Sequence, residues 1–310
     1  MSSSTSYRGW GVAFAFAGVV AFSFRPFWIK LAYGVPTVTG HPVSPVTLLF
    51  LRMLLSLPFF LAIAWWLKKN PSGGEKPLTR RDWWAVAGLG FVGYYLASFL
   101  DFIGLQYVGV GVGRLILFLY PTLVLLLSFL FLRKPPRRRE VAALVVSYSG
   151  VALVLSNQFC SGTAGKLFLL GVLLIFASAL CYAVYLVAGS QMVKRIGSMR
   201  FTAYTMIVST VPAVVQFFAL EPLSALELPA PVWTYAIVMA TFSTVLPVFL
   251  QSEALKRIGA NRFALIGAIG PVTTAIAGAL GLEETFTWLQ AAGGALVIFG
   301  VLLVSLKPKA

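Results

Sequence analysis

The chain has 310 residues, of which 59% are hydrophobic and only 11% are charged. Soluble domains carry about 25% charged residues, so this composition excludes a water-soluble globular fold and predicts a protein that exposes its apolar residues to lipid. The net charge of +15 raises the question of a nucleic-acid partner. The Lys and Arg residues, however, gather in short connections between apolar runs, which is typical of membrane topology and argues for no nucleic-acid binding.

Apolar runs close to the roughly 20 residues that cross a bilayer core recur along the whole chain. Breaks at charged residues, Pro and Gly divide them into ten predicted transmembrane helices. In chain order these cover 9–31, 44–67, 83–105, 109–132, 139–156, 167–188, 201–220, 231–255, 260–281 and 286–306. The first run has the length of a secretory signal core, but it continues through RPFWIKLAY, which favours an uncleaved helix.

The connections between these helices alternate in charge. With ten helices, 19 of the 24 Lys and Arg residues fall on one side of the membrane, whereas the other side keeps Lys166 and four acids. Those acids are Glu221, Glu227, Glu283 and Glu284. The positive-inside rule then predicts an integral protein of the bacterial inner membrane with both termini in the cytoplasm, residues 1–8 and 307–310 forming short tails.

The two halves of the chain resemble each other. A shift of 150 residues aligns Trp83 with Trp233, Pro121 with Pro271, and SGVALV (149–154) with FGVLLV (299–304) without a gap. Each half holds five predicted helices, an odd number, so the second copy must enter the membrane from the opposite side. We therefore expect an all-α membrane protein built from two inverted five-helix repeats, 9–156 and 167–306, an arrangement typical of secondary transporters.

Several segments in equivalent places carry a family resemblance. They are a helix with a central proline in YPTLVLLL, the loops LFLRKPPRRRE and LGLEETFTWLQ, and closing helices that end SGVALVL or FGVLLVS. This pattern resembles the paired EamA domains of the drug/metabolite transporter superfamily over nearly the whole chain. The resemblance implies ten helices, alternating access, and export or exchange of small metabolites such as amino acids. The first loop departs from the pattern because basic residues replace the acidic ones that LGLEET keeps.

Four charged residues lie inside predicted helices of the first half: Arg25, Arg52, Asp101 and Arg114. At 1.5 Å per residue, all four fall about 6–10 Å to the external side of the midplane. A charge at such depth usually faces a cavity or a partner. One interpretation is a structural ion pair between Asp101 and Arg114 that joins the third and fourth helices. Another is that Arg25 or Arg52 extends toward the external headgroups.

The functional interpretation is a substrate site. Three arginines against one aspartate leave an excess of positive charge, and arginine binds carboxylate or phosphate in a bidentate manner. We therefore expect a small anionic or zwitterionic substrate, an amino acid or an organic acid. Asp101 would orient an arginine, bind a substrate amine or carry a coupling proton, whereas exchange would need a counter-substrate. Oligomeric state is left open by the sequence, which is compatible with a monomer.

Neutral side chains complete the predicted site. The candidates in the first half are Trp28, Tyr94, Tyr95 and Tyr120, and those in the second half are Tyr182, Tyr185, Tyr204, Gln216, Tyr235 and Gln251. Aromatic residues in membrane helices also serve packing and interface belts, which remains the alternative for each of them. Pro121 and Pro271 occupy equivalent places near mid-membrane, so we expect them to act as paired hinges or as packing residues.

Other motifs suggest neither a cofactor nor an enzyme. GVGVG at 109–113 imitates a nucleotide loop but lacks the preceding strand and the following Lys-Ser/Thr. Two cysteines and one histidine are too few for a metal cluster or a disulfide framework. The alternative function, a membrane-embedded lipid-modifying enzyme or a scramblase, would need a catalytic cluster or leave the layered arginines unexplained.

Overall fold

A computed structural model describes residues 2–37, 40–70, 78–132, 138–160, 165–267, 269–282 and 287–305. These residues are helical apart from turns and a single β-bridge between Pro36 and Pro42, so the predicted all-α class is confirmed for them. Most of the basic loop at 133–139, the acids Glu283 and Glu284 and the tail 307–310 lie outside the described residues.

The first half of the chain forms eight α-helices and one π-helix. They are α1 (Ser2–Ser23), α2 (Arg25–Gly34), α3 (Pro45–Lys69), α4 (Arg80–Gly90), the π-helix η1 (Phe91–Leu96), α5 (Ala97–Tyr107), α6 (Val110–Leu117), α7 (Tyr120–Leu132) and α8 (Arg138–Cys160). Two predicted spans are thus interrupted. The first breaks between α1 and α2, where Pro26 follows Arg25, and the fourth breaks between α6 and α7, where Pro121 follows Tyr120.

The second half contains six α-helices, one 3₁₀-helix and one π-helix. They are α9 (Lys166–Ile196), α10 (Ser198–Leu220), the 3₁₀-helix η2 (Leu223–Leu226), α11 (Ala230–Ala240), the π-helix η3 (Thr241–Val245), α12 (Leu246–Gly267), α13 (Gly270–Gly281) and α14 (Trp288–Ser305). Seven stretches of the described chain are long and apolar enough to cross a bilayer, and Glu140–Ser156 and Trp288–Leu303 are shorter apolar helices. The chain is therefore a helical integral membrane protein.

Two predicted boundaries were wrong. The sixth span was expected to end at residue 188, but α9 continues through Gly189, whose φ is not positive, to Ile196. The helix ends before Gly197, whose φ is 83°. The expected break at 255–260 between the eighth and ninth spans is also absent, since α12 runs to Gly267. The helix is interrupted instead just before Pro271, where a proline in the interior would remove a hydrogen bond.

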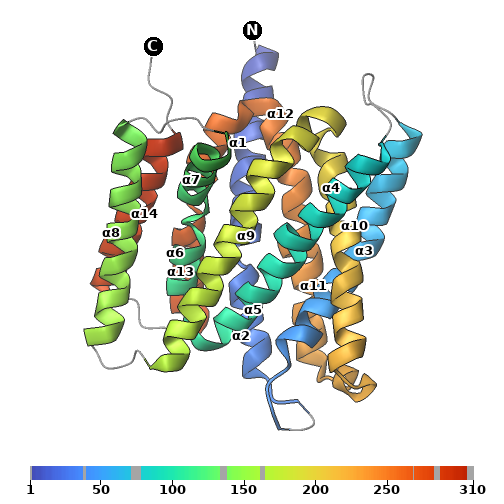
Figure 1. The fold of residues 1–310 in the computed structure, drawn as a ribbon, viewed down its shortest axis with the longest axis vertical. Coiled ribbons are helices and arrows are strands. Elements are labelled where there is room, and N and C mark those ends of the chain that lie inside the picture. Colours follow the sequence, from blue (N-terminus) through green and yellow to red (C-terminus); the bar gives the residue numbers. More distant parts are fainter. Residues whose placement is uncertain are drawn as a thin grey trace.

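The helices pack in pairs that mirror each other between the halves. The closest partners are α1 with α12, α5 with α9, α3 with α10, and α8 with α14. Figure 1 shows that α1 runs from the upper end downward, whereas α9 runs from the lower end upward, so the corresponding first elements of the two halves point in opposite directions. The start of α1 and the end of α14 lie at the same end of the bundle (Figure 1).

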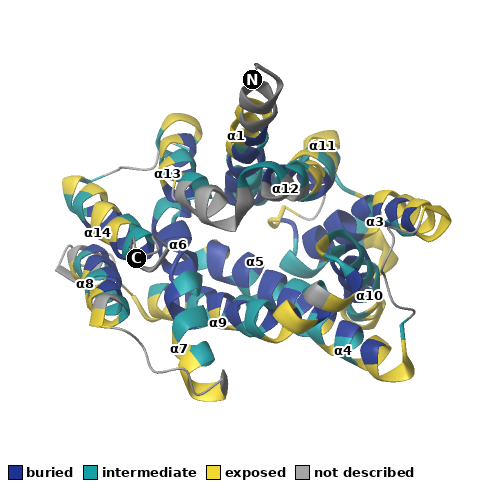
Figure 2. Ribbon diagram, turned by 90° about the horizontal axis from the view of Figure 1, so that it is seen from above, coloured by how far each residue is buried: buried dark blue, intermediate teal, exposed yellow. Residues whose placement is uncertain are grey.

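The bundle buries its interior face and exposes apolar residues around its circumference. Figure 2 shows buried residues on the inward faces, most densely on α5, α6 and α9, and exposed ones on the outward faces. Large side chains such as Trp65, Trp84 and Leu280 are more than half exposed. A soluble monomer would not expose so many large apolar side chains, and in a bilayer these faces contact lipid.

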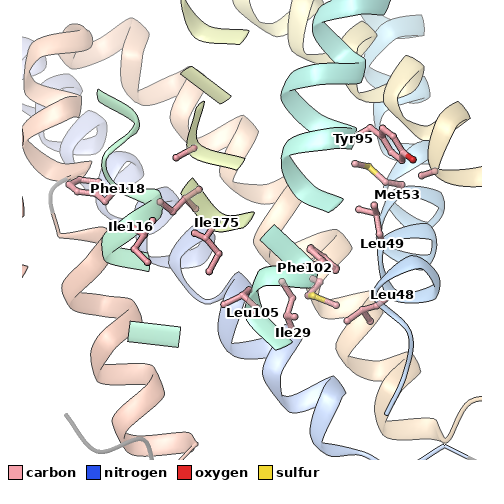
Figure 3. Packing of buried hydrophobic residues seen from close by; sticks show 14 of the residues in the cluster. Ile29, Leu48, Leu49, Met53, Tyr95, Phe102, Leu105, Ile116, Phe118 and Ile175 are labelled. Carbon is pink, nitrogen blue, oxygen red and sulfur yellow. The ribbon is translucent and has the colours of Figure 1, made fainter. Parts of the chain in front are cut away.

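The packed core joins α2, α3 and α5. Figure 3 shows Phe102 and Leu105 of α5 against Ile29 of α2 and Leu48 of α3, all of them fully or almost fully buried. This cluster ties the broken first span to the third span. A side chain of α2 also bonds the α5 backbone, because the Tyr33 hydroxyl donates a 2.9 Å hydrogen bond to the Phe102 carbonyl.

Helices α8 and α14 cross at glycines that occupy equivalent positions. A Cβ atom added to Gly150 would lie 2.5 Å from the carbonyl oxygen of Gly293, and one added to Gly300 would lie 2.8 Å from that of Ala143. A shift of 150 residues converts the first of these contacts into the second. Such small-residue crossings let membrane helices approach closely, and here the close approach is repeated.

Candidate functional site

A cavity of about 330 Å³ lies between the halves and is lined by both of them. Its described lining residues are Val19, Phe22, Arg25, Arg52, Gly93, Tyr94, Ala97, Ser98, Arg114, Leu117, Phe118, Tyr120, Ser178, Tyr182, Leu186, Met206, Ser243, Thr244, Pro247, Val248, Gln251, Gly267 and Gly270. The volume is at the lower end of the range for small-molecule sites, so the cavity can hold a small metabolite.

Equivalent positions of the two halves line the cavity together. Six pairs separated by 150 residues contribute to it, namely Gly93 and Ser243, Tyr94 and Thr244, Ala97 and Pro247, Ser98 and Val248, Leu117 and Gly267, and Tyr120 and Gly270. The cavity therefore lies where corresponding segments of the two copies meet.

Two π-helices, one from each half, contribute residues to the lining of this cavity. They begin at Phe91 in η1 and at Thr241 in η3, which are again 150 residues apart. Each interrupts an otherwise α-helical span, and π-turns of this kind are frequent at functional sites. Gly93 and Tyr94 line the cavity from η1, and Ser243 and Thr244 line it from η3.

Helix breaks lie beside the cavity in equivalent places. The Leu119 amide bonds the Ile116 carbonyl at 3.1 Å, and the Ile269 amide bonds the Ile266 carbonyl at the same distance. In each copy the next helix starts one residue later, with Pro121 or Pro271 as its second residue. Both prolines predicted as hinges therefore follow a real interruption of the helical hydrogen-bond ladder.

Asp101 binds Arg25. The Arg25 Nη2 atom lies 3.0 Å from Asp101 Oδ2, and the carboxylate side chain is only 3% exposed. Arg25 is the first residue of α2, where the helix dipole is positive, so a cation there needs a compensating anion. The predicted pairing of Asp101 with Arg114 was wrong, because the break before α2 brings Arg25 to the carboxylate instead. Asp101 is not among the residues that line the cavity.

Arg52 is almost completely buried, with 1% of its surface exposed, and lines the cavity from α3. Its Nη2 atom donates to Ser98 Oγ at 2.9 Å, and its guanidinium lies 5.4 Å from the Phe102 ring centroid. The Nε atom has no hydrogen-bond partner. The idea that Arg52 extends toward the headgroups is therefore wrong, since the side chain points into the protein.

Arg114 lines the cavity from α6 and is 6% exposed. Its guanidinium lies 4.9 Å from the centroid of Phe22, whose ring is also 5.0 Å from the guanidinium of Arg25. Within the described part of the chain, Arg114 forms no ion pair, and its buried Nε has no hydrogen-bond partner. The cation–π contact with Phe22 is therefore a specific contact that this guanidinium makes.

The predicted neutral candidates divide into two groups. Tyr94, Tyr120, Tyr182 and Gln251 line the cavity, whereas Trp28, Tyr95, Gln216, Tyr185, Tyr204 and Tyr235 are not among its described lining residues. Several of the second group have packing roles that the sequence allowed for. Trp28 stacks on Tyr235 at 6.1 Å between centroids, and Tyr95 stacks on Phe99 at 6.2 Å.

Small hydroxyl residues were missed by the sequence analysis. Ser98, Ser178, Ser243 and Thr244 line the cavity, and Ser243 Oγ is buried without a hydrogen-bond partner. Ser178 instead donates to the Ala97 carbonyl at 2.6 Å. The usable signal was the repeat itself, because Ser243 and Thr244 align with Gly93 and with Tyr94, which was already a candidate.

Comparisons with known proteins identify the class. The model of the EamA-like transporter family matches residues 9–156 and again residues 169–306. The chain is 31% identical to the uncharacterized transporter YcbK of Bacillus subtilis over 297 residues, covering 93% of this chain and 90% of that protein. It is 22% identical to an uncharacterized transporter of Archaeoglobus fulgidus, covering 91% and 95%.

A solved crystal structure supports the fold. It superposes with a TM-score of 0.63 at 18% identity and covers 94% of this chain and 95% of the other. The chain belongs to the EamA-like transporter family. It is a membrane transporter, and the family is not enzymatic.

Proposed function

We propose that the chain is a secondary transporter that moves a small anionic or zwitterionic metabolite, an amino acid or an organic acid, across a bacterial inner membrane. One observation carries the proposal: a cavity lined by equivalent segments of two copies contains three arginines, one of which is held by the nearby Asp101. Substrate sites of secondary transporters lie at such repeat interfaces. Arginine forks suit carboxylates and phosphates.

In this proposal the two halves, 9–156 and 167–306, are inverted repeats of five spans each. The opposite directions of α1 and α9 and the mirrored helix pairs support it (Figure 1). Alternating access follows when one copy rocks against the other about the breaks that precede Pro121 and Pro271. The abundance of basic residues in the connections on the side of the termini favours a cytoplasmic location for both.

The proposed substrate contacts are Arg52, Arg114, Arg25, Tyr94, Tyr120, Tyr182 and Gln251, with Asp101 orienting Arg25. Transport is export or exchange, driven by a coupling proton or by a counter-substrate. The residues other than Asp101 are favoured over the remaining candidates because they line the cavity and because their polar atoms can donate hydrogen bonds to an anion.

Counterflow in liposomes tests the proposal. Purified protein should accelerate saturable counterflow of labelled amino acids or organic acids, and Arg25→Gln or Arg52→Gln should weaken it. Arg80→Gln is the matched control, because Arg80 is exposed at the start of α4 and away from the cavity lining. Absence of counterflow across a broad metabolite panel would contradict the transporter mechanism, and equal loss in the Arg80 control would contradict the site.

A further inference from the structure

The charge of the cavity is unbalanced. Among the described residues that line it, Arg25, Arg52 and Arg114 are the charged ones, and none is acidic. Asp101 lies just outside this lining and compensates Arg25 through their 3.0 Å ion pair. Arg52 and Arg114 have no such partner within the described residues, so two positive charges remain uncompensated.

The other acids that the structure describes do not compensate these two arginines. The sequence has nine Asp and Glu residues in total. Of those described, Asp82 pairs with Arg195 at 2.9 Å, and Glu253 pairs with Arg257 at 3.4 Å. Glu140, Glu221 and Glu227 lie at or beyond helix ends. None of these five lines the cavity.

The two arginines without an acidic partner are also buried, which makes their uncompensated charge unfavourable. Arg52 and Arg114 are 1% and 6% exposed, and each keeps a buried Nε without a hydrogen-bond partner. An isolated charge in a low-dielectric interior is strongly unfavourable unless an opposite charge compensates it. A ligand that brings anionic oxygens to both guanidinium groups would supply that compensation and also occupy their free donors.

We propose that the substrate is a small dianion, a dicarboxylate or a phosphate monoester, rather than a zwitterion or a monoanion. This inference rests on the proposed function and narrows its substrate class. A zwitterion would place an ammonium group in a cavity with no acidic side chain among its described lining. A monoanion would leave one of the two buried guanidinium groups uncompensated.

Hydroxyl groups in the lining suit the same ligand. Ser243 Oγ is buried, lines the cavity and has no partner, so it is available to donate to an anionic oxygen. Tyr94, Tyr120 and Tyr182 bring three phenols to the same cavity. A cavity of about 330 Å³ accommodates a chain of three or four carbons with two anionic ends, which limits the dianion to a small one.

A series of four-carbon ligands tests the charge requirement. Succinate, butyrate and γ-aminobutyrate share a four-carbon skeleton and carry net charges of about −2, −1 and zero near neutral pH. Binding to the purified full-length protein in nanodiscs is measured by tryptophan fluorescence. Glycerol 3-phosphate distinguishes a phosphate preference from a carboxylate preference. We expect at least one dianion to bind about tenfold or more tightly than butyrate and γ-aminobutyrate.

Variants connect the preference to the two arginines. Arg52→Gln and Arg114→Gln should each reduce the preference for the dianion over butyrate about tenfold. Arg114→Lys keeps the charge but loses the planar fork, so it should reduce the preference less than Arg114→Gln does. Arg80→Gln should not change it. If a glutamine variant does not fold, the ligand series on the unaltered protein and the lysine variant decide the question.

The outcomes separate this inference from the proposed function. Saturable counterflow of amino acids or monocarboxylates, with no dianion bound or exchanged, would overturn the dianion inference and leave the transporter proposal intact. Equal affinity for all members of the series would also overturn it. Absence of counterflow for every ligand would overturn both. If Arg52→Gln and Arg114→Gln each leave the preference for the dianion unchanged, the inference that the two arginines select a dianion is overturned.

Discussion

The two halves of the molecule share one backbone design and differ in the chemistry that they bring to the cavity. Both place a π-helix and a proline-associated helix break at equivalent positions. The first half contributes Arg25, Arg52 and Arg114, whereas the second contributes neutral groups such as Ser243 and Gln251. The backbone geometry is thus repeated in both copies, whereas the charged side chains of the described cavity lining come from one copy.

The largest test of this asymmetry is Asp101→Asn. Removing the carboxylate leaves the Arg25 cation buried without its partner, so we expect the free energy of unfolding to fall by about 3–5 kcal/mol. Gln251→Asn changes the equivalent residue of the second half, an uncharged glutamine, and should change the free energy of unfolding by less than about 1 kcal/mol. Reversible denaturation of the purified protein in mixed micelles measures both.

A double variant shows whether the stability lost in Asp101→Asn comes from the ion pair with Arg25. Arg25→Gln combined with Asp101→Asn removes both charges, and we expect it to recover more than half of the stability lost by Asp101→Asn. If the double variant is as unstable as the sum of the single ones, the two residues do not compensate each other.

The glycine crossing of α8 and α14 tests the shared backbone design. Gly150→Ala and Gly300→Ala each force a Cβ against the backbone of the other helix, so each should destabilise the protein by about 1–3 kcal/mol. Gly88→Ala is the control, because its Cβ would meet no atom within 4 Å. Thermal unfolding in detergent compares the three. A loss at only one of the two crossing glycines would argue against equivalent packing.

Two serines sharpen the difference in chemistry. Ser98 accepts a hydrogen bond from the buried Arg52, so Ser98→Ala should lower stability by about 1–2 kcal/mol. Ser243 has no partner, and Ser243→Ala should leave stability within about 0.5 kcal/mol of the unaltered protein. Denaturation curves of the two variants are compared directly. If both variants lose the same stability, Ser243 also makes a stabilising hydrogen bond, which would contradict this prediction.

The smallest expected effect concerns the helix interruptions that precede Pro121 and Pro271. Pro121→Ala and Pro271→Ala restore a backbone donor at each interruption, and we expect about threefold slower counterflow with unchanged half-saturating substrate concentration. Pro58→Ala is the matched control, because Pro58 lies inside the continuous helix α3. An effect on affinity rather than on rate, or an equal effect of Pro58→Ala, would argue against paired hinges.

Much of the cavity lining was predictable, because charged and large polar side chains inside an apolar run are conspicuous. Arg25, Arg52, Arg114, Tyr94, Tyr120, Tyr182 and Gln251 were predicted as site residues and line the cavity. Ser98 and Ser243 were missed, since a serine is common in membrane helices and carries no charge. Trp28, Tyr95 and Gln216 were candidates by residue type alone, and helix rotation, which residue type does not define, directs them elsewhere.

The sequence by itself determined the membrane class, the all-α fold and the internal similarity, because apolar content, run length and the 150-residue register are properties of the chain alone. Only the tertiary structure decided which arginine Asp101 binds. Depth along a helix axis follows from residue number, but the direction of a side chain around that axis depends on breaks and packing. The interruption before α2 turns Arg25 toward Asp101 and leaves Arg114 against Phe22.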